Sequence, residues 1–282
     1  MIIVLGIILE KRNIQNKVRK MKYRIYQIDA FTDKVFYGNP AAVCPLEKWI
    51  SDDLLQKIAM ENNLAETAFF VKRDNEYQIR WFTPKTEVDL CGHATLAAAY
   101  VLFNHENYTG DTINFYSTRS GKLTVTKQDD SLALNFPIDI YESIELSEDL
   151  IQGFDILPKY ALKGKTDYVL IFESENQIEK IKPDLNQIAK LGGRGVIITA
   201  KGDDADFVSR FFAPQSGIDE DPVTGSAHTT LTPYWSKRLN KTELTAIQLS
   251  KRKGYLNCKL LDDRVEISGK AKLYLIGEIY VD

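Results

Sequence analysis

A glutamate in an apolar stretch is the first residue of this sequence that could carry out acid–base chemistry. Glu66 lies within Asn63–Val71, between a predicted helix end and a strongly apolar predicted strand. Apolar surroundings desolvate a carboxylate and favour its protonated form, so such a glutamate can both accept and return a proton. The alternative, an ordinary glutamate at a strand edge, stays open. Glu61, on the predicted helix, is expected to be solvated.

Two glycines each stand before a segment with helical character, and each is followed by a polar residue. Gly92 precedes His93 in the first half of the chain, and Gly225 precedes Ser226 in the second half. The first N–H groups of a helix have no partner within the helix and carry the positive end of its dipole. Two such starts facing one cavity would bind a small carboxylate or phosphate. Taken singly, each glycine is better explained as a turn residue, whereas the repeated pair favours anion binding.

His93 and Asp221 are further candidates for proton transfer or substrate binding. His93 occupies the first position of an apolar predicted helix, where the helix terminus disfavours the imidazolium and keeps the ring neutral. A neutral imidazole suits a hydrogen-bond partner or a proton relay. Asp221 lies five residues ahead of Ser226. The alternatives are a satisfied core histidine and a loop acid.

Hydrophobic patterning predicts the elements that position these residues. A helix opens at Ser51–Asp53, where a side-chain acceptor is followed by acids in the first turn. Gly92–Phe103 is apolar all the way round, which predicts a core helix wrapped by sheet. A second helix is predicted from Ala227 to Leu239. Strands are predicted at Tyr23–Phe31, Thr67–Val71, Tyr77–Phe82, Ile247–Ser250, Leu256–Leu261, Val265–Ser268 and Leu273–Val281.

The two halves of the chain share a short pattern. The sequence RWFTP at Arg80–Pro84 returns as RFFAP at Arg210–Pro214, and Gly92–Ala94 returns as Gly225–Ala227. Such self-similarity indicates a duplicated domain, although a chance match of short motifs is the alternative. We therefore expect a leader at residues 1–21 outside the fold and two α/β halves at residues 22–130 and 131–282, with the last strand able to pack back on the first half.

Composition excludes several classes of function. The chain has 282 residues, of which 44% are hydrophobic and 27% charged, with a net charge of −3. These values are typical of a soluble globular protein without the basic stripe of a nucleic-acid binder. Residues 1–9 are apolar but far shorter than the roughly 20 residues of a membrane span, and basic residues follow this run instead of preceding it as in a secretory signal. We expect no nucleic-acid or membrane partner.

The cysteines and histidines argue against disulfide and metal chemistry. Cys44, Cys91 and Cys258 are odd in number and widely spaced, without a CxxC pair. This pattern argues against a disulfide framework and favours a reducing, cytoplasmic location. The three histidines form no HExxH arrangement, and a metal centre would need nearly all of them. We expect no metal.

Five motifs resemble those of the phenazine-biosynthesis isomerase (PhzF-like) family, of the diaminopimelate-epimerase-like superfamily. They are Asp29–Thr32, Gly38–Val43, Glu61–Phe69, Asp89–Thr95 and Ile218–His228. The resemblance runs from about Lys22 to the carboxyl end. It implies an α/β (α+β) fold with two similar halves, each with a mixed, barrel-like sheet around a central helix. It also implies a homodimer.

The resemblance further implies an isomerase with a cofactor-free site in the cleft between the halves, acting on a small cyclic or amino carboxylic acid. In the characterised phenazine enzyme a glutamate moves a proton between carbons of a cyclic amino-hydroxy acid, and by motif position that glutamate is Glu66. The same correspondence gives catalytic roles to His93, Asp221 and Ser226 and substrate-binding roles to Gly92, Gly225 and Asn39.

Racemases of this architecture use two thiols, one at each helix start. Cys91 occupies the first such place, but the second reads Val223–Gly225, and Cys258 lies far along the chain. A two-thiol racemisation is therefore not expected, and Cys91 is interpreted as a packed small hydrophobe. An epimerase that uses Glu66 with another base, or a small-carboxylate-binding protein without turnover, are the alternatives to the isomerase.

Overall fold

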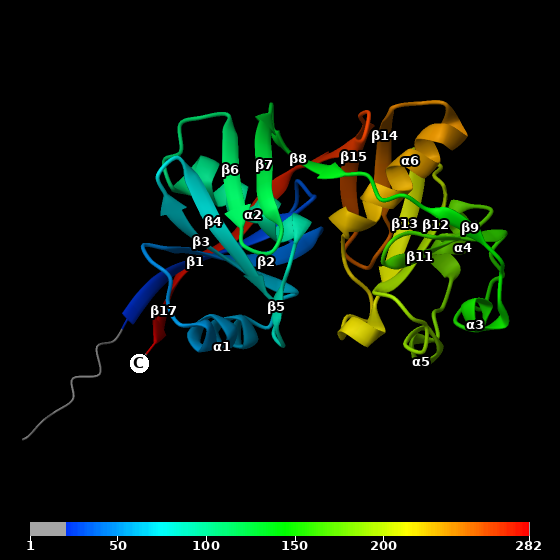
Figure 1. The fold of residues 1–282 in the computed structure, drawn as a ribbon, viewed down its shortest axis with the longest axis horizontal. Helices are drawn as coiled ribbons and strands as arrows, with labels where there is room; N and C mark the ends of the chain where they lie inside the picture. The colour runs from blue at the N-terminus through cyan, green and yellow to red at the C-terminus, as the bar shows by residue number, and fades with distance from the viewer. Residues whose placement is uncertain (1–20, 282) are drawn as a thin grey trace, which may run out of the picture.

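The computed structural model describes residues 21–281, and Met21 already pairs with Val281 in a sheet. The rest of the predicted leader, residues 1–20, lies outside the described residues. Figure 1 shows two lobes, the first built around α2 and the second around α6, with β8 running between them. The seventeen described strands belong to one continuous hydrogen-bonded sheet.

The elements of the first lobe, with the strand that leaves it, occupy the first half of the chain. They are β1 (Met21–Ala30), β2 (Asn39–Leu46), α1 (Asp52–Asn62), β3 (Glu66–Arg73), β4 (Glu76–Phe82), β5 (Glu87–Val88), α2 (Gly92–His105), β6 (Thr112–Ser117), β7 (Gly121–Gln128) and β8 (Ser131–Pro137).

The remaining elements build the second lobe, apart from the last strand, which returns to the first. They are β9 (Glu142–Ile144), α3 (Glu148–Ile151), β10 (Tyr160–Lys163), β11 (Asp167–Ile171), α4 (Glu175–Lys180), α5 (Leu185–Ile188), β12 (Gly195–Lys201), β13 (Phe207–Phe212), the 3-10 turns η1 (Pro214–Ser216) and η2 (Gly225–Ala227), α6 (His228–Leu239), β14 (Glu243–Gln248), β15 (Gly254–Leu260), β16 (Arg264–Gly269) and β17 (Ala271–Val281).

Helix α1 begins where the sequence predicts and sets the position of Glu66. The Ser51 side chain caps the helix by accepting a hydrogen bond from the Leu54 N–H. Asn63 ends the helix in the left-handed conformation, with φ of 48°, which a short polar side chain tolerates better than most. The chain then turns into β3, whose first residue is Glu66.

Helix α2 is the core helix that its apolar sequence predicts. Nine of its residues are buried, His93 among them, and it contacts β1, β2, β3 and β8. Its alanines allow these strands to approach closely. No side chain caps its amino terminus at Cys91, so the first N–H groups at Gly92 stay available beside the space between the lobes.

The second helix starts differently from the prediction. Gly225 opens the short 3-10 turn η2, and the α-helix α6 begins only at His228. Two equivalent glycine-led α-helices were expected, and this expectation was wrong for the second half. The glycines nevertheless face each other, because a Cβ built on either one would lie 3.9 Å from the Cα of the other. Strand β14 also begins at Glu243, ahead of the predicted Ile247.

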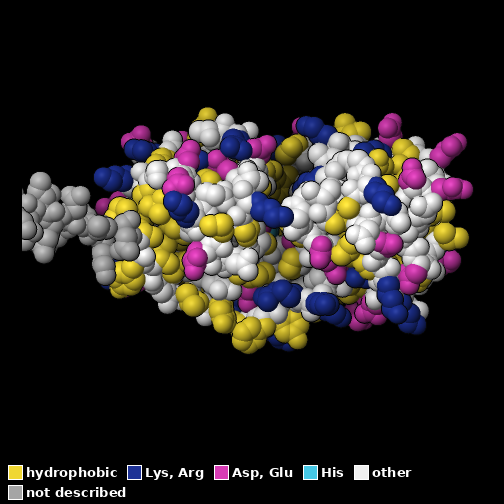
Figure 2. Space-filling model, turned by 90° about the horizontal axis from the view of Figure 1, so that it is seen from below, with side chains coloured by type: hydrophobic (Ala, Val, Ile, Leu, Met, Phe, Trp, Pro, Cys, Tyr) yellow, Lys and Arg dark blue, Asp and Glu magenta, His cyan; other side chains and the backbone are white. Residues whose placement is uncertain are grey.

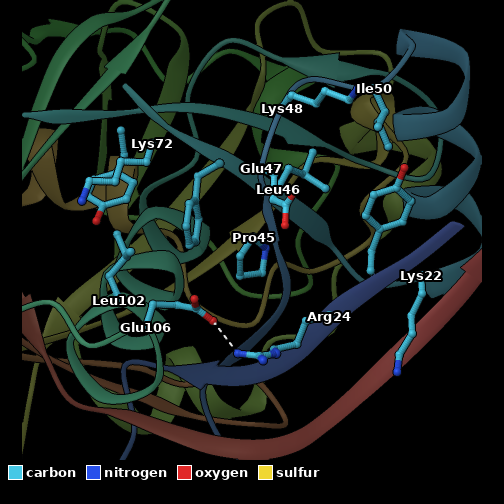
Figure 3. Close-up of a pocket in the computed structure, with 13 residues that line it drawn as sticks. Lys22, Arg24, Pro45, Leu46, Glu47, Lys48, Ile50, Lys72, Leu102 and Glu106 are labelled. Atoms are coloured by element: carbon cyan, nitrogen blue, oxygen red, sulfur yellow. Dashed lines mark hydrogen bonds and ion pairs between the residues drawn. The ribbon is translucent and has the colours of Figure 1, made fainter. Parts of the chain in front are cut away.

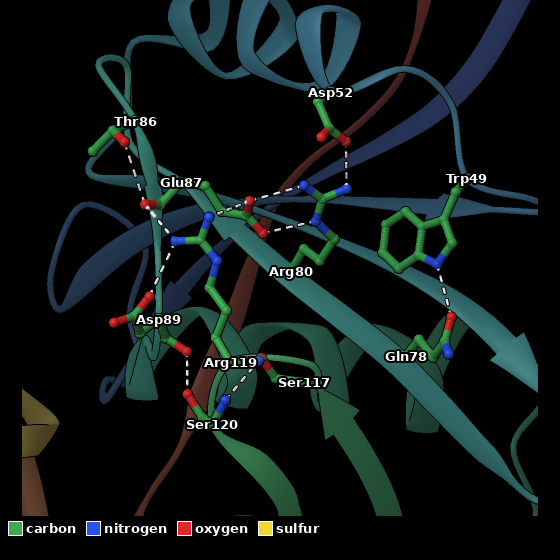
Figure 4. Close-up of polar contacts among 10 residues, drawn as sticks. All are labelled: Trp49, Asp52, Gln78, Arg80, Thr86, Glu87, Asp89, Ser117, Arg119 and Ser120. Carbon is green, nitrogen blue, oxygen red and sulfur yellow. Dashed lines mark hydrogen bonds and ion pairs between the residues drawn. The ribbon is translucent and has the colours of Figure 1, made fainter.

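The duplication is visible in the equivalent hairpins β3–β4 and β12–β13. Thr67 pairs with Phe82 in the first hairpin, and Val196 pairs with Phe212 in the second. In both, the repeated arginine forms a two-pronged ion pair with a carboxylate and stacks on a phenylalanine. Arg80 binds Glu87 and lies 5.1 Å from the Phe82 ring, as Arg210 binds Glu220 and lies 5.0 Å from the Phe212 ring. Figure 4 shows the Arg80–Glu87 pair.

Two strand pairings join the halves. β8 pairs with β7 through Val125 and Leu134 and with β16 through its other edge. β17 pairs antiparallel with β1 along the whole of that strand. Strand β8 therefore pairs with a strand of each half. Since β8 starts at residue 131 and belongs to neither half alone, the boundary between residues 130 and 131 stays a prediction. The fold class, a duplicated α/β architecture with a mixed sheet, is confirmed.

Candidate active site

A cleft of about 590 Å³ lies between the halves, and most of the predicted site residues line it. Figure 2 shows the surface hollowed between the two lobes. Six of the seven predicted site residues contribute to the lining, namely Glu66, Gly92, His93, Asp221, Gly225 and Ser226. Apolar walls formed in part by Phe136 and Phe211 reduce the access of water to them.

Glu66 and His93 form the closest pair of proton-carrying groups in the cleft. His93 Nε2 lies 3.1 Å from Glu66 Oε2, and both side chains are about nine-tenths buried. Among the described residues, Glu66 Oε2 has no hydrogen-bond partner of good geometry. A buried carboxylate oxygen without a partner is costly, so a substrate hydrogen is a natural partner for it.

Asn39 lies behind the cleft and does not line it. Its side chain is fully buried, and its Nδ2 is 2.8 Å from Asp221 Oδ1, 2.9 Å from the Val223 carbonyl and 3.2 Å from His93 Nδ1. Asn39 was predicted as a substrate-binding residue. Its place in the structure is that of a bridge that holds His93 and Asp221 together across the two halves.

The charge state of His93 differs from the prediction. Burial acts to lower the pKa of this imidazole, but its interactions with Cys91 and Glu66 raise the pKa above its ordinary value. This direction runs against the expectation of a neutral ring, which considered only the helix terminus, whereas the Asn39 amide group, a donor, requires an unprotonated Nδ1 to accept its hydrogen bond. The adjacent Glu66 carboxylate stabilises the imidazolium.

Asp221 combines burial with a well-defined hydrogen-bond environment. Burial raises the pKa of its carboxyl group to about 6, although the charge on His93 and hydrogen bonds from Thr224 and Asn39 oppose this rise. Gln248 donates to the Asp221 carbonyl and accepts from the Thr224 N–H, which fixes the loop. Asp221 therefore exchanges its proton close to neutral pH.

Cys91 contacts the histidine but is not ionised near neutral pH. Its Sγ lies 3.5 Å from His93 Nδ1, and burial raises the pKa of the thiol to about 11. The ligand atoms of Glu66, Cys91 and His93 all lie within 4.8 Å of one another. The scarcity of histidine suggested no metal site, yet these three side chains form a donor set that could hold a cation. Cys258 does not line the cleft.

Arg194 lines the cleft but was not among the predicted site residues. Its Nε donates to Asp167 Oδ1 at 3.0 Å, its Nη2 donates to Asp167 Oδ2, and its Nη1 donates to Ser226 Oγ at 2.8 Å. The guanidinium also lies over the Phe211 ring. The internal repeat is the signal that could have found it, because Arg194 directly precedes β12, whose first residue Gly195 corresponds to Glu66, the first residue of β3.

A loop from the first half forms one rim of the cleft and is fixed by arginines. Arg119 donates to Glu87 Oε2 at 3.0 Å and to Asp89 Oδ1 at 3.1 Å, while Arg80 holds the same Glu87 (Figure 4). Across the rim, the Lys85 side chain lies against Gly217 of the second half. Residues of both halves thus meet at the mouth of the cleft.

A second hollow, of about 520 Å³, lies on the first lobe. Arg24 and Glu106 in this hollow pair with each other, with Arg24 Nη1 3.1 Å from Glu106 Oε1 (Figure 3). No histidine or cysteine lines this hollow. The cleft between the halves is therefore the better candidate for an active site. No helix among residues 21–281 is long and apolar enough to span a membrane.

Comparisons with known proteins show what this chain is similar to. The chain is 49% identical over 261 residues to an uncharacterized isomerase of Pseudomonas aeruginosa, covering 93% of this chain and all of that one. It matches the crystal structure of a PhzF-family phenazine biosynthesis protein from Enterococcus faecalis with a TM-score of 0.90 and 48% identity, over 93% and 100% of the two chains. These relatives confirm the expectation of an isomerase-type enzyme of unassigned substrate.

A more distant structure shows the breadth of the fold. A hydroxyproline epimerase from Agrobacterium vitis, with bound trans-4-hydroxy-L-proline, matches with a TM-score of 0.60 at 9% identity, over 93% of each chain. At that identity the likeness concerns the fold alone. The model of the phenazine biosynthesis-like proteins matches residues 28–277, and the chain belongs to this family.

Proposed function

We propose that the protein is an isomerase that moves a proton within a small cyclic or amino carboxylic acid, with Glu66 as the shared acid and base and without a cofactor. The observation that carries the proposal is the Glu66 carboxylate, buried at the cleft, with Oε2 lacking a hydrogen-bond partner and lying 3.1 Å from His93. A group that is held in this way can transfer protons without first losing a shell of water.

The neighbouring groups suggest how the transfer proceeds. Glu66 accepts a proton from a substrate carbon and returns it at another carbon of the same molecule. His93 donates toward charge that develops on the substrate, and Asn39, which donates to Asp221 Oδ1 and lies 3.2 Å from His93 Nδ1, holds the two side chains in position. General acid–base catalysis of this kind typically contributes 10²–10⁴-fold to a rate.

Hydrogen exchange tests the proposal most directly. A panel of cyclic amino and hydroxy acids is incubated in D2O with the wild-type protein and exchange at carbon is followed by NMR. The variant E66Q should exchange about 10²-fold more slowly or worse. E61Q is the matched control, because Glu61 is exposed on α1. Normal exchange by E66Q would exclude Glu66 from the proton transfer.

The same experiment separates the alternatives. An epimerase would produce the mirror configuration at the exchanging carbon, which chiral chromatography detects, whereas an isomerase would place deuterium at a new carbon. A binding protein without turnover would be stabilised thermally by members of the panel and would exchange no hydrogen.

We also propose that the protein forms a homodimer through the outer face of β17. Tyr274, Ile276 and Tyr280 on this strand are between 47% and 64% exposed, and neighbouring apolar side chains of this kind are typical of protein interfaces. Hydrophobic side chains gather on the first lobe in Figure 2. Sedimentation equilibrium should give twice the mass of the chain, and I276K should give the mass of one.

A further inference from the structure

Two of the family motifs, Asp29–Thr32 and Gly38–Val43, flank the loop between β1 and β2, and the backbone of this loop is strained. Phe31 has φ of 62° and Phe36 has φ of 73°, in the left-handed region that bulky side chains rarely adopt. Strain of this kind persists only where the surroundings fix the backbone. Contacts with the rest of the protein therefore hold this loop in place.

Arg252 of the second half supplies these contacts. It lies in the loop between β14 and β15, and its Nη2 donates to Asp29 Oδ1 at 2.8 Å and to the Tyr37 carbonyl at 3.0 Å. Its Nε donates to the Gly38 carbonyl at 2.8 Å. The other oxygen of Asp29 accepts from the Phe36 N–H at 2.8 Å. Asp29 is only 1% exposed, so its ion pair with Arg252 joins the two halves at a site largely closed to water.

Gly38 is held by the second half at both of its backbone polar groups. Arg252 donates to its carbonyl, and its own N–H donates to the Lys253 carbonyl at 2.7 Å. A larger residue would not fit, because φ is 65° here and a Cβ would overlap the Ala30 carbonyl oxygen. Asn39 follows directly, as the first residue of β2. The second half therefore fixes the backbone from which the Asn39 side chain extends.

The loop that carries Arg252 is also tied to the segment that carries Asp221. Ser250 Oγ donates to the Pro222 carbonyl at 2.8 Å. The same oxygen accepts from the N–H groups of Arg252 and Lys253, at 3.3 and 3.2 Å. Arg252 and Asp221 therefore belong to one hydrogen-bonded unit of the second half.

Asn39 meets this unit from the first half, since its amide donates to Asp221 Oδ1 and lies 3.2 Å from His93 Nδ1. We propose that Arg252 is a positioning residue of the cleft, which holds the backbone before Asn39 and so keeps the Asn39 amide between His93 and Asp221. Arg252 itself does not line the cleft. The positioning stands on geometry, and its effect on proton transfer rests on the proposed function.

NMR of the imidazole nitrogens tests this role without a substrate. The chain has three histidines, and H93N identifies the signals of His93. N39A should shift the His93 Nδ1 signal, because the neighbouring amide is lost. R252Q should shift it in the same direction, because the amide is displaced. His105, at the other end of α2, stacks on Tyr26, so its signals should stay in place and serve as an internal control.

R264Q is the matched control for the loss of an arginine. Arg264 on β16 donates to the side chain and the carbonyl of Asn135 on β8, the strand between the lobes. It does not line the cleft and makes no contact with the loop before Asn39. R264Q should therefore leave the His93 signals unchanged.

R252K separates positioning from stability. Lysine keeps a positive charge opposite Asp29 but lacks the planar fork that reaches Asp29 and Gly38 together. R252K should therefore unfold at a temperature closer to that of the wild type than R252Q does, while its His93 Nδ1 signal stays displaced. A merely structural role predicts that R252K restores both the unfolding temperature and the His93 signal.

Hydrogen exchange at carbon connects this role to the proposed function. R252Q should slow exchange of the panel roughly 2- to 10-fold, the range expected for one misplaced hydrogen bond. Normal exchange by E66Q would refute the proposed function, whereas the NMR result does not depend on turnover and decides the positioning by itself. Where R252Q does not fold, R252K carries the same prediction for His93. Unmoved His93 signals in the folded variant, or His105 signals that move equally, overturn the proposal.

Discussion

Replacing Asp221 with asparagine should change how the stability of the protein depends on pH. Burial raises the pKa of this carboxyl group from 3.8 to about 6. The folded state then keeps a proton that the unfolded state has released, so the group stabilises the fold below pH 3.8 and this contribution is lost as the pH rises through about 6. Asparagine has no proton to lose.

The size of the effect follows from the two pKa values. The difference between 3.8 and about 6 corresponds to about 3 kcal/mol in the free energy of unfolding. Urea unfolding of the wild-type protein and D221N at several pH values measures it. The stability of D221N relative to the wild type should rise by about 3 kcal/mol between roughly pH 3 and pH 8. Titration of groups remote from Asp221 cancels in this difference, whereas His93 and Glu66 interact with its carboxyl group.

Two results would refute this reasoning. A stability difference that does not change with pH would mean that the Asp221 carboxyl group keeps its ordinary pKa in the fold. A difference that changes in the opposite direction would mean that the positive charge of His93 and the hydrogen bonds from Thr224 and Asn39 outweigh burial. In either case the cleft would hold a permanently ionised aspartate at neutral pH.

Two other substitutions test the surroundings of the cleft. Burial lowers the pKa of His228 to about 4. The neutral ring therefore stabilises the fold above pH 6.5, and this contribution is lost as the pH falls through about 4. H228N should abolish the resulting acid-induced loss of about 3 kcal/mol in the free energy of unfolding, measured with urea, and an unchanged loss would contradict this. A methyl group on Gly225 would meet Phe31 and Gly92 only at 3.8–3.9 Å, so G225A should change the free energy of unfolding by less than about 1 kcal/mol. A larger loss in urea unfolding would contradict this.

Local pattern was enough to predict the elements whose residues all face one environment. Gly92–Phe103 is apolar on every side, and the structure confirms a helix surrounded by strands. The start of α1 was predicted from the acceptor at Ser51 and the acids that follow it. In both cases the physical cause acts within one or two helical turns, which a sequence displays directly.

Features that depend on distant partners could not be predicted in this way. Cys91 and Glu66 raise the pKa of His93, and since Glu66 belongs to another element, the helix terminus alone could not predict this direction. Arg194 lies in a loop without periodicity, and its partner Asp167 is 27 residues away. The pairing of Met21 with Val281 joins the two ends of the described chain, and no local pattern carries that information.

The repeated fold with unlike residues also bears on which reaction is possible. A two-thiol racemase needs one proton-carrying group on each side of the substrate, supplied by equivalent positions of the two halves. Here Glu66 and His93 lie on one side, whereas the position that corresponds to Glu66 in the second half is Gly195, whose neighbour Arg194 contacts Ser226 on the other side. Asp221 comes from the second half, but Asn39 joins it to His93, so the groups that titrate gather on one side. An arginine is always charged and cannot accept a proton from carbon. We therefore expect the proton to leave and return on the same face of the substrate, which is the geometry of isomerisation and not of racemisation.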